Sequence, residues 1–375
     1  MISSKFPAGY DALLAEARAL AAQVMPLAAQ VDESTTLDDR VLAALRESGL
    51  SRVMIPALWG GRTDAVDPVG VCLVREVLMP ASAQLDAVFA LQGIGSYAVV
   101  RAGSAEQQER WLPLVAECRA LAALALTEPQ AGSDLKAIET TLTEEGGVLR
   151  LTGMKSFISN AGEASFYTVL AREANGYSLV LVPADAPGIT VSRHGALIAP
   201  HVIGDVQFGG VALDRGARIG APGDGFDLVL ATLTMFRASV AGAAVGLAGA
   251  ALDAAVAHAK ERIQFGRPLI KQGQVGAMLA DSWVEIEMAR LLTYHAAAAV
   301  AAGDPDALML SSGAKLAASE TAARVTDRAV QVMGRFGLVR GTNVERYYRQ
   351  ARALRIYEGA SEVLRAGIAK RLGED

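Results

Sequence analysis

The sequence predicts a multi-domain α+β protein that is mainly helical, with a helical domain at each end of the chain and a β domain between them. Three observations lead to this prediction. The chain has 375 residues, more than one hydrophobic core usually holds. Hydrophobic residues make up 52% of it and aromatic residues only 5%, so Ala, Leu and Val dominate, as in closely packed helices. Apolar residues follow helical spacing near both ends but alternate in the middle.

Residues 1–120 are predicted to form an N-terminal α-helical domain. The segment DALLAEARALAAQVMPLAAQV, which begins at Asp11, repeats apolar residues at intervals of three and four, and so does LDDRVLAALRESGL from Leu37. The glycines and the proline of PALWGG, from Pro56 to Gly61, separate such segments. We therefore expect helices joined by turns in this part of the chain.

Residues 121–222 are predicted to form a middle antiparallel β domain. The runs VLRLTGMKSFI from Val148 and YSLVLVPA from Tyr177 alternate or are rich in strand-forming residues, and Gly, Pro and Asn turns divide them. No helical segment separates these runs, so the order differs from the βαβ pattern of a nucleotide-binding Rossmann sheet.

Residues 223–375 are predicted to form a C-terminal four-helix bundle. Long helical repeats begin near Phe226, Val275 and Ala307, and a last helical segment lies near the C-terminus. Three glycines fall inside the first repeat: Gly242, Gly246 and Gly249. A phosphate-binding glycine turn follows a strand, so these glycines indicate close helix packing instead.

Charge and cysteine content exclude several classes of protein. The net charge is −5 without a basic run, which argues against a nucleic-acid surface or an anionic membrane surface. Cys72 and Cys118 are far apart, so neither a disulfide framework nor a thiolate metal site is expected. The first twenty residues lack the apolar core of a secretion signal. We therefore expect a soluble, cytoplasmic protein without membrane insertion.

Several common catalytic motifs are missing from the sequence. It contains no GxxxxGK[ST] loop, no GxSxG elbow, no HExxH and no pair of ExxH motifs. The four histidines stand singly: His194, His201, His258 and His295. An isolated histidine carries no ligand geometry, so we expect structural or surface roles and no metal site.

Four separated segments together resemble the acyl-CoA dehydrogenase family. They are ALTEPQAGSD from Ala125, GMKSFISNAGEASFYTVLAR from Gly153, ERIQFGRPL from Glu261, and the stretch from AVQVMGRFG through RIYEGASEVLR near the C-terminus. Their order and spacing also match the family. The resemblance implies the three domains described above, one FAD per subunit and a homotetramer, or a homodimer.

The first two segments carry residues for the flavin. A strand that runs into the Pro-Gly turn of LTEPQAGSD presents backbone N–H groups and hydroxyls outward. The resemblance assigns Leu126 and Thr127 to the flavin ring, and Ser133 to the flavin phosphates or the bound thioester. In SFISN, alternation puts Phe157 and Ser159 on one strand face. By resemblance Phe157 lies against the isoalloxazine, a place that core packing would also explain, and Ser159 lies near flavin N5.

The third and fourth segments carry residues for a cofactor of a neighbouring subunit. Arg262 and Gln264 follow the end of a long helix, where a fixed positive charge can meet a pyrophosphate; an ordinary surface ion pair is the alternative. The resemblance implies that Arg262 and Gln264 contact this FAD, joined by Gln331 and Gly334 of QVMGRFG. Tetramer formation would then be part of cofactor binding.

Two positions depart from the family pattern. Gly273 stands where many members have a glutamine that contacts FAD, and Arg335 replaces the second glycine of the QxxGG signature. Gly273 would weaken a contact with FAD. Arg335 puts a bulky cation near the expected path of the adenosine phosphates, where it could obstruct the cofactor or bind its phosphate.

Glu358, in RIYEGASEV, resembles the catalytic base of the family. Some members carry the base on a long helix immediately before an arginine, but here Phe236 occupies that position before Arg237. Burial would raise the pKa of Glu358 and make it a stronger base. The resemblance implies that the Glu358 N–H polarises the thioester oxygen and that Arg237 lies near the substrate, although a buried ion pair would also explain Arg237. Gly359 allows close approach of the backbone.

The sequence thus predicts an FAD-dependent acyl-CoA dehydrogenase that introduces an α,β double bond into an acyl-CoA thioester, with Glu358 taking the α-proton and flavin N5 the β-hydride. The expected electron acceptor is an electron-transfer flavoprotein. Three alternatives stay open: an oxidase that uses O₂, a dehydrogenase of a carrier-protein thioester, and an inactive scaffold of the same fold.

Overall fold

The computed structural model describes residues 7–374 except 175 and 196, and these separate into two compact units. The bundle unit lies within residues 1–32, 68–86 and 234–375, and the sheet unit within residues 33–67 and 87–233. Helices α5 (Ala83–Ala102) and α7 (Gly225–Glu261) contribute residues to both. The division into three domains at residues 120 and 222 stays a prediction, because each unit combines segments from both sides of a boundary.

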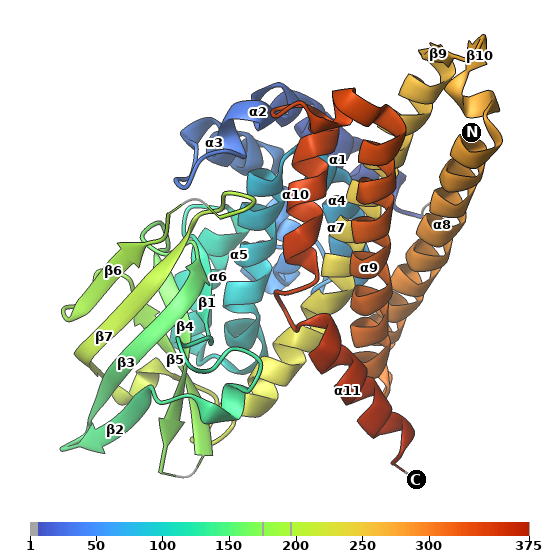
Figure 1. Cartoon of the computed structure of the whole chain (residues 1–375). Helices are drawn as coiled ribbons and strands as arrows, with labels where there is room; N and C mark the ends of the chain where they lie inside the picture. The colour runs from blue at the N-terminus through green and yellow to red at the C-terminus, as the bar shows by residue number, and fades with distance from the viewer. Residues whose placement is uncertain (1–6, 175, 196, 375) are drawn as a thin grey trace. The chain divides into compact units, whose positions relative to one another are not determined.

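The bundle unit is built from long helices that pack along one another (Figure 1). Besides parts of α5 and α7, it contains α1 (Asp11–Val24), α2 (Ala28–Val31), α4 (Pro68–Ala81), α8 (Gly273–Ala302), α9 (Ala307–Met333), α10 (Asn343–Leu354) and α11 (Ser361–Leu372). Two helices, α10 and α11, follow α9 where the sequence predicts one. The break between them is the Arg355–Ala360 turn, which contains Glu358.

Small residues form much of the bundle core. The buried cluster contains ten or more alanines from α7, α8 and α9 together with Leu, Ile and Val side chains. A Cβ atom on Gly242 would lie 2.5 Å from the Cys72 carbonyl oxygen, and one on Gly246 would lie 1.9 Å from that of Glu76. The expected role of these two glycines in close helix packing is therefore confirmed, whereas Gly249 has ordinary space around it.

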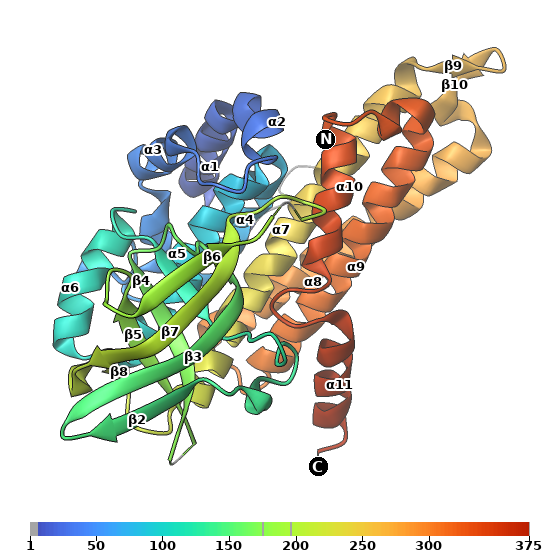
Figure 2. The ribbon, with the colours of Figure 1, turned by 60° about the vertical axis from the view of Figure 1, so that its left-hand side comes forward.

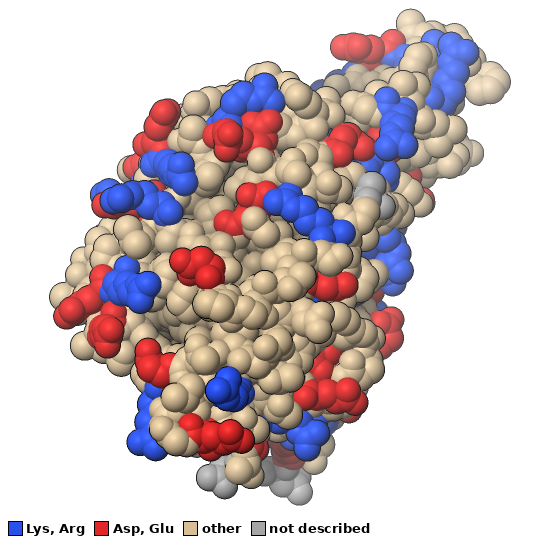
Figure 3. Space-filling view, turned by 90° about the vertical axis from the view of Figure 1, so that its left-hand side faces the viewer, with Lys and Arg blue, Asp and Glu red and all other residues tan. Residues whose placement is uncertain are grey.

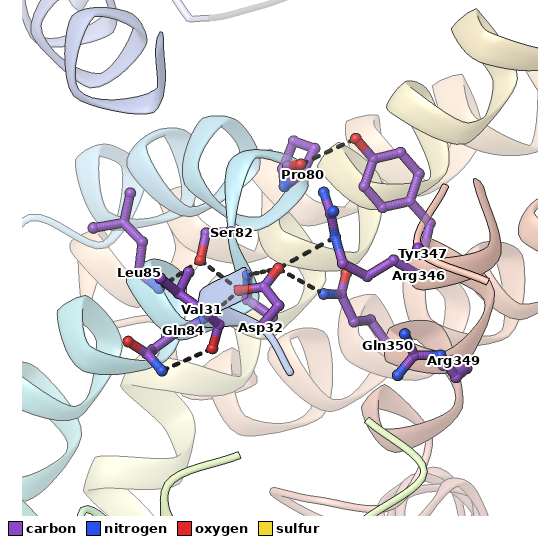
Figure 4. A network of polar contacts seen from close by, with 12 residues as sticks. Val31, Asp32, Pro80, Ser82, Gln84, Leu85, Arg346, Tyr347, Arg349 and Gln350 are labelled. Atoms are coloured by element: carbon purple, nitrogen blue, oxygen red, sulfur yellow. Dashed lines mark hydrogen bonds and ion pairs between the residues drawn. The ribbon is translucent and has the colours of Figure 1, made fainter. Parts of the chain in front are cut away.

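A buried carboxylate joins three parts of the bundle unit (Figure 4). Asp32, at the end of α2, accepts hydrogen bonds from Ser82 Oγ at 2.5 Å and from the Gln84 N–H at 3.1 Å, near the start of α5. It also accepts one from Gln350 Nε2 of α10 at 3.0 Å and lies 3.3 Å from Arg346 Nε. Asp32 therefore caps α5 and ties α10 to it, which compensates the removal of its charge from water.

The sheet unit contains a twisted sheet with α-helical segments outside it (Figure 2). Its strands are β1 (Ala122–Ala125), β2 (Thr141–Glu145), β3 (Val148–Ser159), β4 (Phe166–Glu173), β5 (Gly176–Pro183), β6 (Ile189–Arg193), β7 (Ile203–Leu213) and β8 (Arg218–Ile219). The helices are α3 (Asp39–Ser48) and α6 (Ala105–Ala116), with the sheet-unit parts of α5 and α7.

The sheet is mainly antiparallel, as the sequence predicts, but β4 departs from that pattern. The strand order is β6-β7-β3-β2-β4-β5-β8, with β1 beside β4. β4 pairs in parallel with both β1 and β2. Other strands lie between β4 and each of these two along the chain, so neither pair is joined by a hairpin. Alternation along a strand indicates which face is buried but not the direction of its partner.

Within the part of the chain that the structure describes, two helical stretches are long and apolar enough to cross a membrane: Asp11–Val31 and Gly225–Glu261. The second is α7, whose most apolar window is 67% buried inside the protein, as in the core helix of a soluble protein. On the face drawn in Figure 3, Lys and Arg side chains lie among Asp and Glu side chains. Neither feature by itself indicates a membrane surface or a nucleic-acid surface.

We expect Gly246→Ala to destabilise the protein by about 1–3 kcal/mol, because the new methyl group would overlap the Glu76 carbonyl and force α4 and α7 apart. Gly249→Ala is the matched control, since its nearest neighbour would be 4.0 Å away. Alanine is favoured over glycine in a helix by up to about 1 kcal/mol, so this control should keep or raise the Tm. Equal Tm values for the two variants in thermal unfolding would contradict the close approach of α4 and α7.

Candidate active site

Glu358 lies in a tight turn between α10 and α11. Its φ is +53° and that of Gly359 is +108°, so two successive residues occupy the left-handed region. For a residue with a side chain this conformation costs about 1–3 kcal/mol, and strain of this kind gathers at functional sites. Ser361 N–H donates to the Arg355 carbonyl and closes the turn at 3.1 Å. The carboxylate is therefore presented by a strained loop rather than by a helix face.

Two cations, the half-buried Arg237 and the buried Lys315, hold the backbone of this turn. Arg237 Nε, from α7, donates to the Glu358 carbonyl at 2.9 Å, and Lys315 Nζ, from α9, donates to the Gly359 carbonyl at 2.6 Å. Arg237 Nη1 also donates to Ser312 Oγ at 3.1 Å. A Cβ atom at Gly359 would come within 2.9 Å of Leu364 and 3.1 Å of Arg237. Glycine is thus required here both by φ and by space.

Nearby positive charges partly compensate the burial of the Glu358 carboxylate. Burial raises its pKa, while the positive charges of Arg75, Lys315 and Arg237 oppose that rise. Among the described residues, its Oε2 is buried and has no hydrogen-bond partner. A buried carboxylate oxygen without a donor is unusual, and it fits a group that must accept a proton from a bound molecule.

Arg75 is the first of these cations and has partners of its own. Its Nε and Nη2 donate to the two carboxylate oxygens of Asp86 at 3.0 and 2.7 Å, and Nη1 donates to Ser239 Oγ at 3.0 Å. Both side chains of this bidentate pair are 3% exposed. The pair fixes the guanidinium, so its field acts on Tyr357 and Glu358 from a defined place.

The alternative position for a base carries no carboxylate. Phe236 is buried, with 1% of its surface exposed, and directly precedes Arg237 on α7. Arg237 instead faces the Glu358 turn, as its hydrogen bond to the Glu358 carbonyl shows. The structure thus brings Arg237, Glu358 and Gly359 together, as the sequence analysis expects.

In the sheet unit, a buried ion pair fixes the segment that contains Leu126 and Thr127. Lys155 Nζ, on β3, donates to Glu128 Oε1 at 2.8 Å and to the Leu126 carbonyl at 2.9 Å. The Ser156 N–H donates to the Thr127 carbonyl at 2.8 Å. Leu126 and Thr127 are half-buried and therefore lie along β3 with one side accessible.

The two members of this ion pair are strongly perturbed. Glu128 also accepts hydrogen bonds from the N–H groups of Glu139 and Thr140 at 2.6 and 2.9 Å. Although burial opposes it, this set of donors lowers the pKa of Glu128 to about 2. Burial lowers the pKa of Lys155 to about 8 despite the carboxylate. Ser133, six residues after Thr127, is exposed.

Phe157 is held outward by a bulge in the sheet. The register of β3 against β7 shifts between Lys155 and Ile158, and Phe157 has a φ of +56° and is 56% exposed. Its N–H donates to Asp205 Oδ1 at 3.4 Å, and its ring meets that of His194 edge to face at 4.5 Å. Ile158 is buried, as alternation predicts, but the bulge was not predicted.

Ser159 follows Phe157 on the same strand and has a buried partner. Ser159 Oγ and His201 Nε2 are hydrogen bonded at 2.8 Å, and burial lowers the pKa of His201 to about 4. The imidazole is therefore neutral at physiological pH. Asp205 also accepts a hydrogen bond from Ser156 Oγ and lies 2.8 Å from His194 Nε2. His194 therefore supports the bulge, and His201 supports Ser159.

In the bundle unit, Arg262 and Arg335 approach the same aromatic ring. Their guanidinium carbons lie 5.8 and 5.0 Å from the centroid of Phe336, and the ring of His258 lies 5.6 Å from it. α7 ends at Glu261, so Arg262 follows the end of a long helix as predicted. Gln331 is exposed near the end of α9.

Gln264 lies in a two-stranded hairpin, β9 (Ile263–Gln264) and β10 (Arg267–Pro268). Phe265, at its tip, is 94% exposed with a φ of +52°. Gly334 ends α9 with a φ of +57°, and Gly273 is the exposed first residue of α8. The structure thus groups the two arginines, while Gln264 hydrogen bonds only within its own loop among the described residues.

Sequence reasoning missed five residues that support these sites: Arg75, Lys315, Lys155, Asp205 and, as a partner of Ser159, His201. Arg75 and Lys315 stand in the apolar runs GVCLVREVLM and SSGAKLAAS. A single Lys or Arg at a buried position of a helix indicates that a polar partner lies nearby, because these side chains are rarely buried without one. The identity of that partner depends on contacts between distant segments, which the signal does not supply.

Three domain families match the chain. "Acyl-CoA dehydrogenase, N-terminal domain" matches residues 9–119, the corresponding middle domain matches residues 123–211, and the C-terminal domain matches residues 223–373. "Probable acyl-CoA dehydrogenase FadE25" of Mycobacterium tuberculosis is 36% identical over 378 residues, which cover 98% of this chain and 96% of that protein.

Two further proteins are similar along most of their length. Cyclohexane-1-carbonyl-CoA dehydrogenase of Geobacter metallireducens is 35% identical over 356 residues, 93% of each chain. Among solved structures, butyryl-CoA dehydrogenase of Megasphaera elsdenii has a TM-score of 0.94 and 29% identity, with 100% of both chains covered.

We expect Glu358→Gln to raise the Tm at pH 8. Because burial raises the pKa of Glu358, the folded protein binds this proton more tightly than the unfolded chain does. Ionisation therefore lowers stability once the pH exceeds the ordinary glutamate value of 4.5, and the loss is complete above the folded-state pKa. Glutamine carries no such charge, so the difference in Tm should vanish near pH 4.5.

Thermal unfolding of both proteins from pH 4.5 to 8 measures this effect. Glu362→Gln is the control, because Glu362 lies four residues further along but its side chain is 79% exposed. The control should show little change of Tm at any pH. A Glu358→Gln protein that is less stable than the native one at pH 8 would contradict a net unfavourable burial of the charge.

Proposed function

The chain belongs to the acyl-CoA dehydrogenase family and is an FAD-dependent oxidoreductase of that class; from this premise we propose that Glu358 is its catalytic base. One observation carries the assignment. The carboxylate is held in a left-handed turn by fixed cations, with a buried oxygen that has no hydrogen-bond partner among the described residues and a pKa raised by burial. These are the properties that a general base for a weak carbon acid needs.

Desaturation removes a proton from the α carbon and a hydride from the β carbon of the acyl thioester. Bound FAD supplies the acceptor for the hydride. Glu358 takes the proton on its carboxylate, so its raised pKa makes the transfer easier than an exposed glutamate would. Its N–H has no partner among the described residues and can donate to the thioester oxygen, which makes the α-proton more acidic.

The residues fit a flavin and its phosphates. In the sheet unit, Phe157 offers an exposed ring with the Ser159 hydroxyl two residues on, and Leu126 and Thr127 lie on the neighbouring segment. In the bundle unit, Arg262 and Arg335 offer two guanidinium groups beside the Phe336 ring, suited to a pyrophosphate and an aromatic base. We assign Arg335 to phosphate binding rather than obstruction, because it lies beside Arg262.

The remaining assignments extend the proposed roles of Glu358 and of the flavin-binding residues. Ser133 is assigned to the flavin phosphates or the thioester, Gln264, Gln331 and Gly334 to the FAD of a neighbouring subunit, and Arg237 and Gly359 to the substrate side. An electron-transfer flavoprotein is the proposed acceptor; a chain from work on such a flavoprotein of Acidaminococcus fermentans has a TM-score of 0.94 and 30% identity. A cytoplasmic location and a role in β-oxidation complete the proposal.

A homotetramer is proposed on the exposed face of α8. Val284, Met288 and Leu291 recur at intervals of four and three, so they form one stripe, and they are 48%, 65% and 73% exposed. Trp283 lies beside them, 43% exposed. Monomeric proteins seldom expose so continuous an apolar stripe, and Phe265 on the β9–β10 hairpin adds a further exposed aromatic group.

For catalysis, we expect Glu358→Gln to bind FAD and fold as the native protein does but to lose a factor of about 10²–10⁴ in turnover. Anaerobic bleaching of the flavin by butyryl-CoA, longer acyl-CoAs and a cyclic acyl-CoA is the measurement, and it also identifies the preferred acyl group. Near-native bleaching in the variant would refute the base. Stoichiometric peroxide release in air by the native enzyme would favour an oxidase instead.

For assembly, we expect the double change Met288→Glu and Leu291→Glu to convert the tetramer to smaller species in light scattering, with loss of FAD. Charges on the stripe would be buried without partners at the subunit contact. Leu58→Glu, at an 80% exposed leucine outside the stripe, is the matched control and should stay tetrameric. A double variant with unchanged mass would contradict the assignment of this face.

A further inference from the structure

Lys315 is a lysine in the middle of α9 whose whole side chain is buried, at 0% exposure. Among the described residues, its Nζ donates only to the Gly359 carbonyl, at 2.6 Å. Burial lowers the pKa of Lys315 to about 8, although the carboxylates of Glu358, Glu320 and Glu362 oppose that change. An ammonium group so placed lowers stability unless it is compensated, so its position calls for a function.

The acceptor lies in the strained left-handed turn that carries Glu358. Glu358 and Gly359 are successive left-handed residues, and the carbonyl group of each accepts a hydrogen bond from one cationic side chain. Arg237 reaches the first from α7, and Lys315 reaches the second from α9. If Lys315 were removed, the Gly359 carbonyl would lose its charged donor and the turn would be held from one side only.

On the basis of the proposed role of Glu358, we propose that Lys315 is a positioning residue for the base. Its hydrogen bond to the Gly359 carbonyl holds the left-handed turn that orients the Glu358 carboxylate. Its positive charge favours the ionised form of that carboxylate. Lys315 does not touch the reacting atoms in this account. It acts through the turn and through the electrostatic field.

The charges that face the two groups fix the sign of the effect. Glu358 is faced by Arg75 of α4, Arg237 of α7 and Lys315 of α9, and by the carboxylate of Asp86 from α5. Lys315 is faced by Glu358, Arg237, Glu320 and Glu362. Removal of the Lys315 charge leaves two cations against the burial of Glu358, so its pKa rises further. In a variant without this charge, the rate of flavin reduction should therefore begin to rise at a higher pH than in the native protein.

The test compares Lys315→Met with Lys315→Arg over pH 5–10 in the FAD-loaded enzyme, with the acyl-CoA that bleaches the native flavin fastest. We expect Lys315→Met to lower kcat about 10- to 100-fold, the size of effect that a misplaced catalytic group gives, with little change in KM. The midpoint of its acid limb should move to higher pH. Lys315→Arg keeps a charged donor, so it should restore the midpoint and part of kcat.

Thr326→Val is the matched control, because Thr326 is buried on the same helix and, among the described residues, its hydroxyl donates only to carbonyl groups of α9. A Lys315→Met protein with the kcat and acid-limb midpoint of Thr326→Val would overturn the proposal. If Lys315→Met does not fold, the Lys315→Arg variant decides the question. A shift in the midpoint of its acid limb would contradict the electrostatic role. An unshifted midpoint together with a reduced kcat would support the positioning role.

Glu358→Gln separates this proposal from the one on which it rests. If Glu358→Gln reduces flavin at the native rate, Glu358 is not the base and both proposals fail. If Glu358→Gln is inactive while Lys315→Met behaves as Thr326→Val does, the base stands and only the role of Lys315 is wrong.

Discussion

The proposed mechanism depends on one constraint, the retention of a carboxylate inside a left-handed turn of a helical bundle. Burial makes Glu358 a better proton acceptor, but it also makes its ionised form unfavourable. Arg237 and Lys315 oppose that penalty while they hold the two carbonyl groups of the turn. The same two contacts thus serve the conformation and the electrostatics of the base, which links α7 and α9 to a residue that belongs to neither.

The close packing of small residues makes this arrangement possible. Gly242 and Gly246 bring α7 against α4 at Cys72 and Glu76, which lie three residues before and one residue after Arg75. At that separation Arg75 reaches Ser239 on α7 and pairs with Asp86. A larger side chain on α7 would move this buried pair away from the Glu358 turn. The alanine-rich composition therefore matters to the electrostatics as well as to the packing.

Much of the fold and the main catalytic candidate could be predicted from the sequence. Helical spacing and alternation are local, so the helices and most strands follow from them. The motif around Glu358 and the absence of a carboxylate at position 236 made Glu358 the candidate base, and that assignment stays a prediction. The break between α10 and α11 and the parallel neighbours of β4 were not predicted, because pairing direction and turn geometry depend on tertiary contacts. Lys315 and the Glu128–Lys155 pair were missed for a related reason. Their partners lie 44 and 27 residues away along the chain.

The central claim concerns the protonation of one carboxyl group, and infrared difference spectroscopy reports it directly. The protonated carboxyl stretch of Glu358 can be isolated as the difference between the native protein and Glu358→Gln, followed over pH 4–9. The account predicts that this signal titrates above the ordinary glutamate value of 4.5 and that the midpoint rises further in Lys315→Met. A midpoint at or below 4.5, unchanged when Lys315 is replaced, would contradict it.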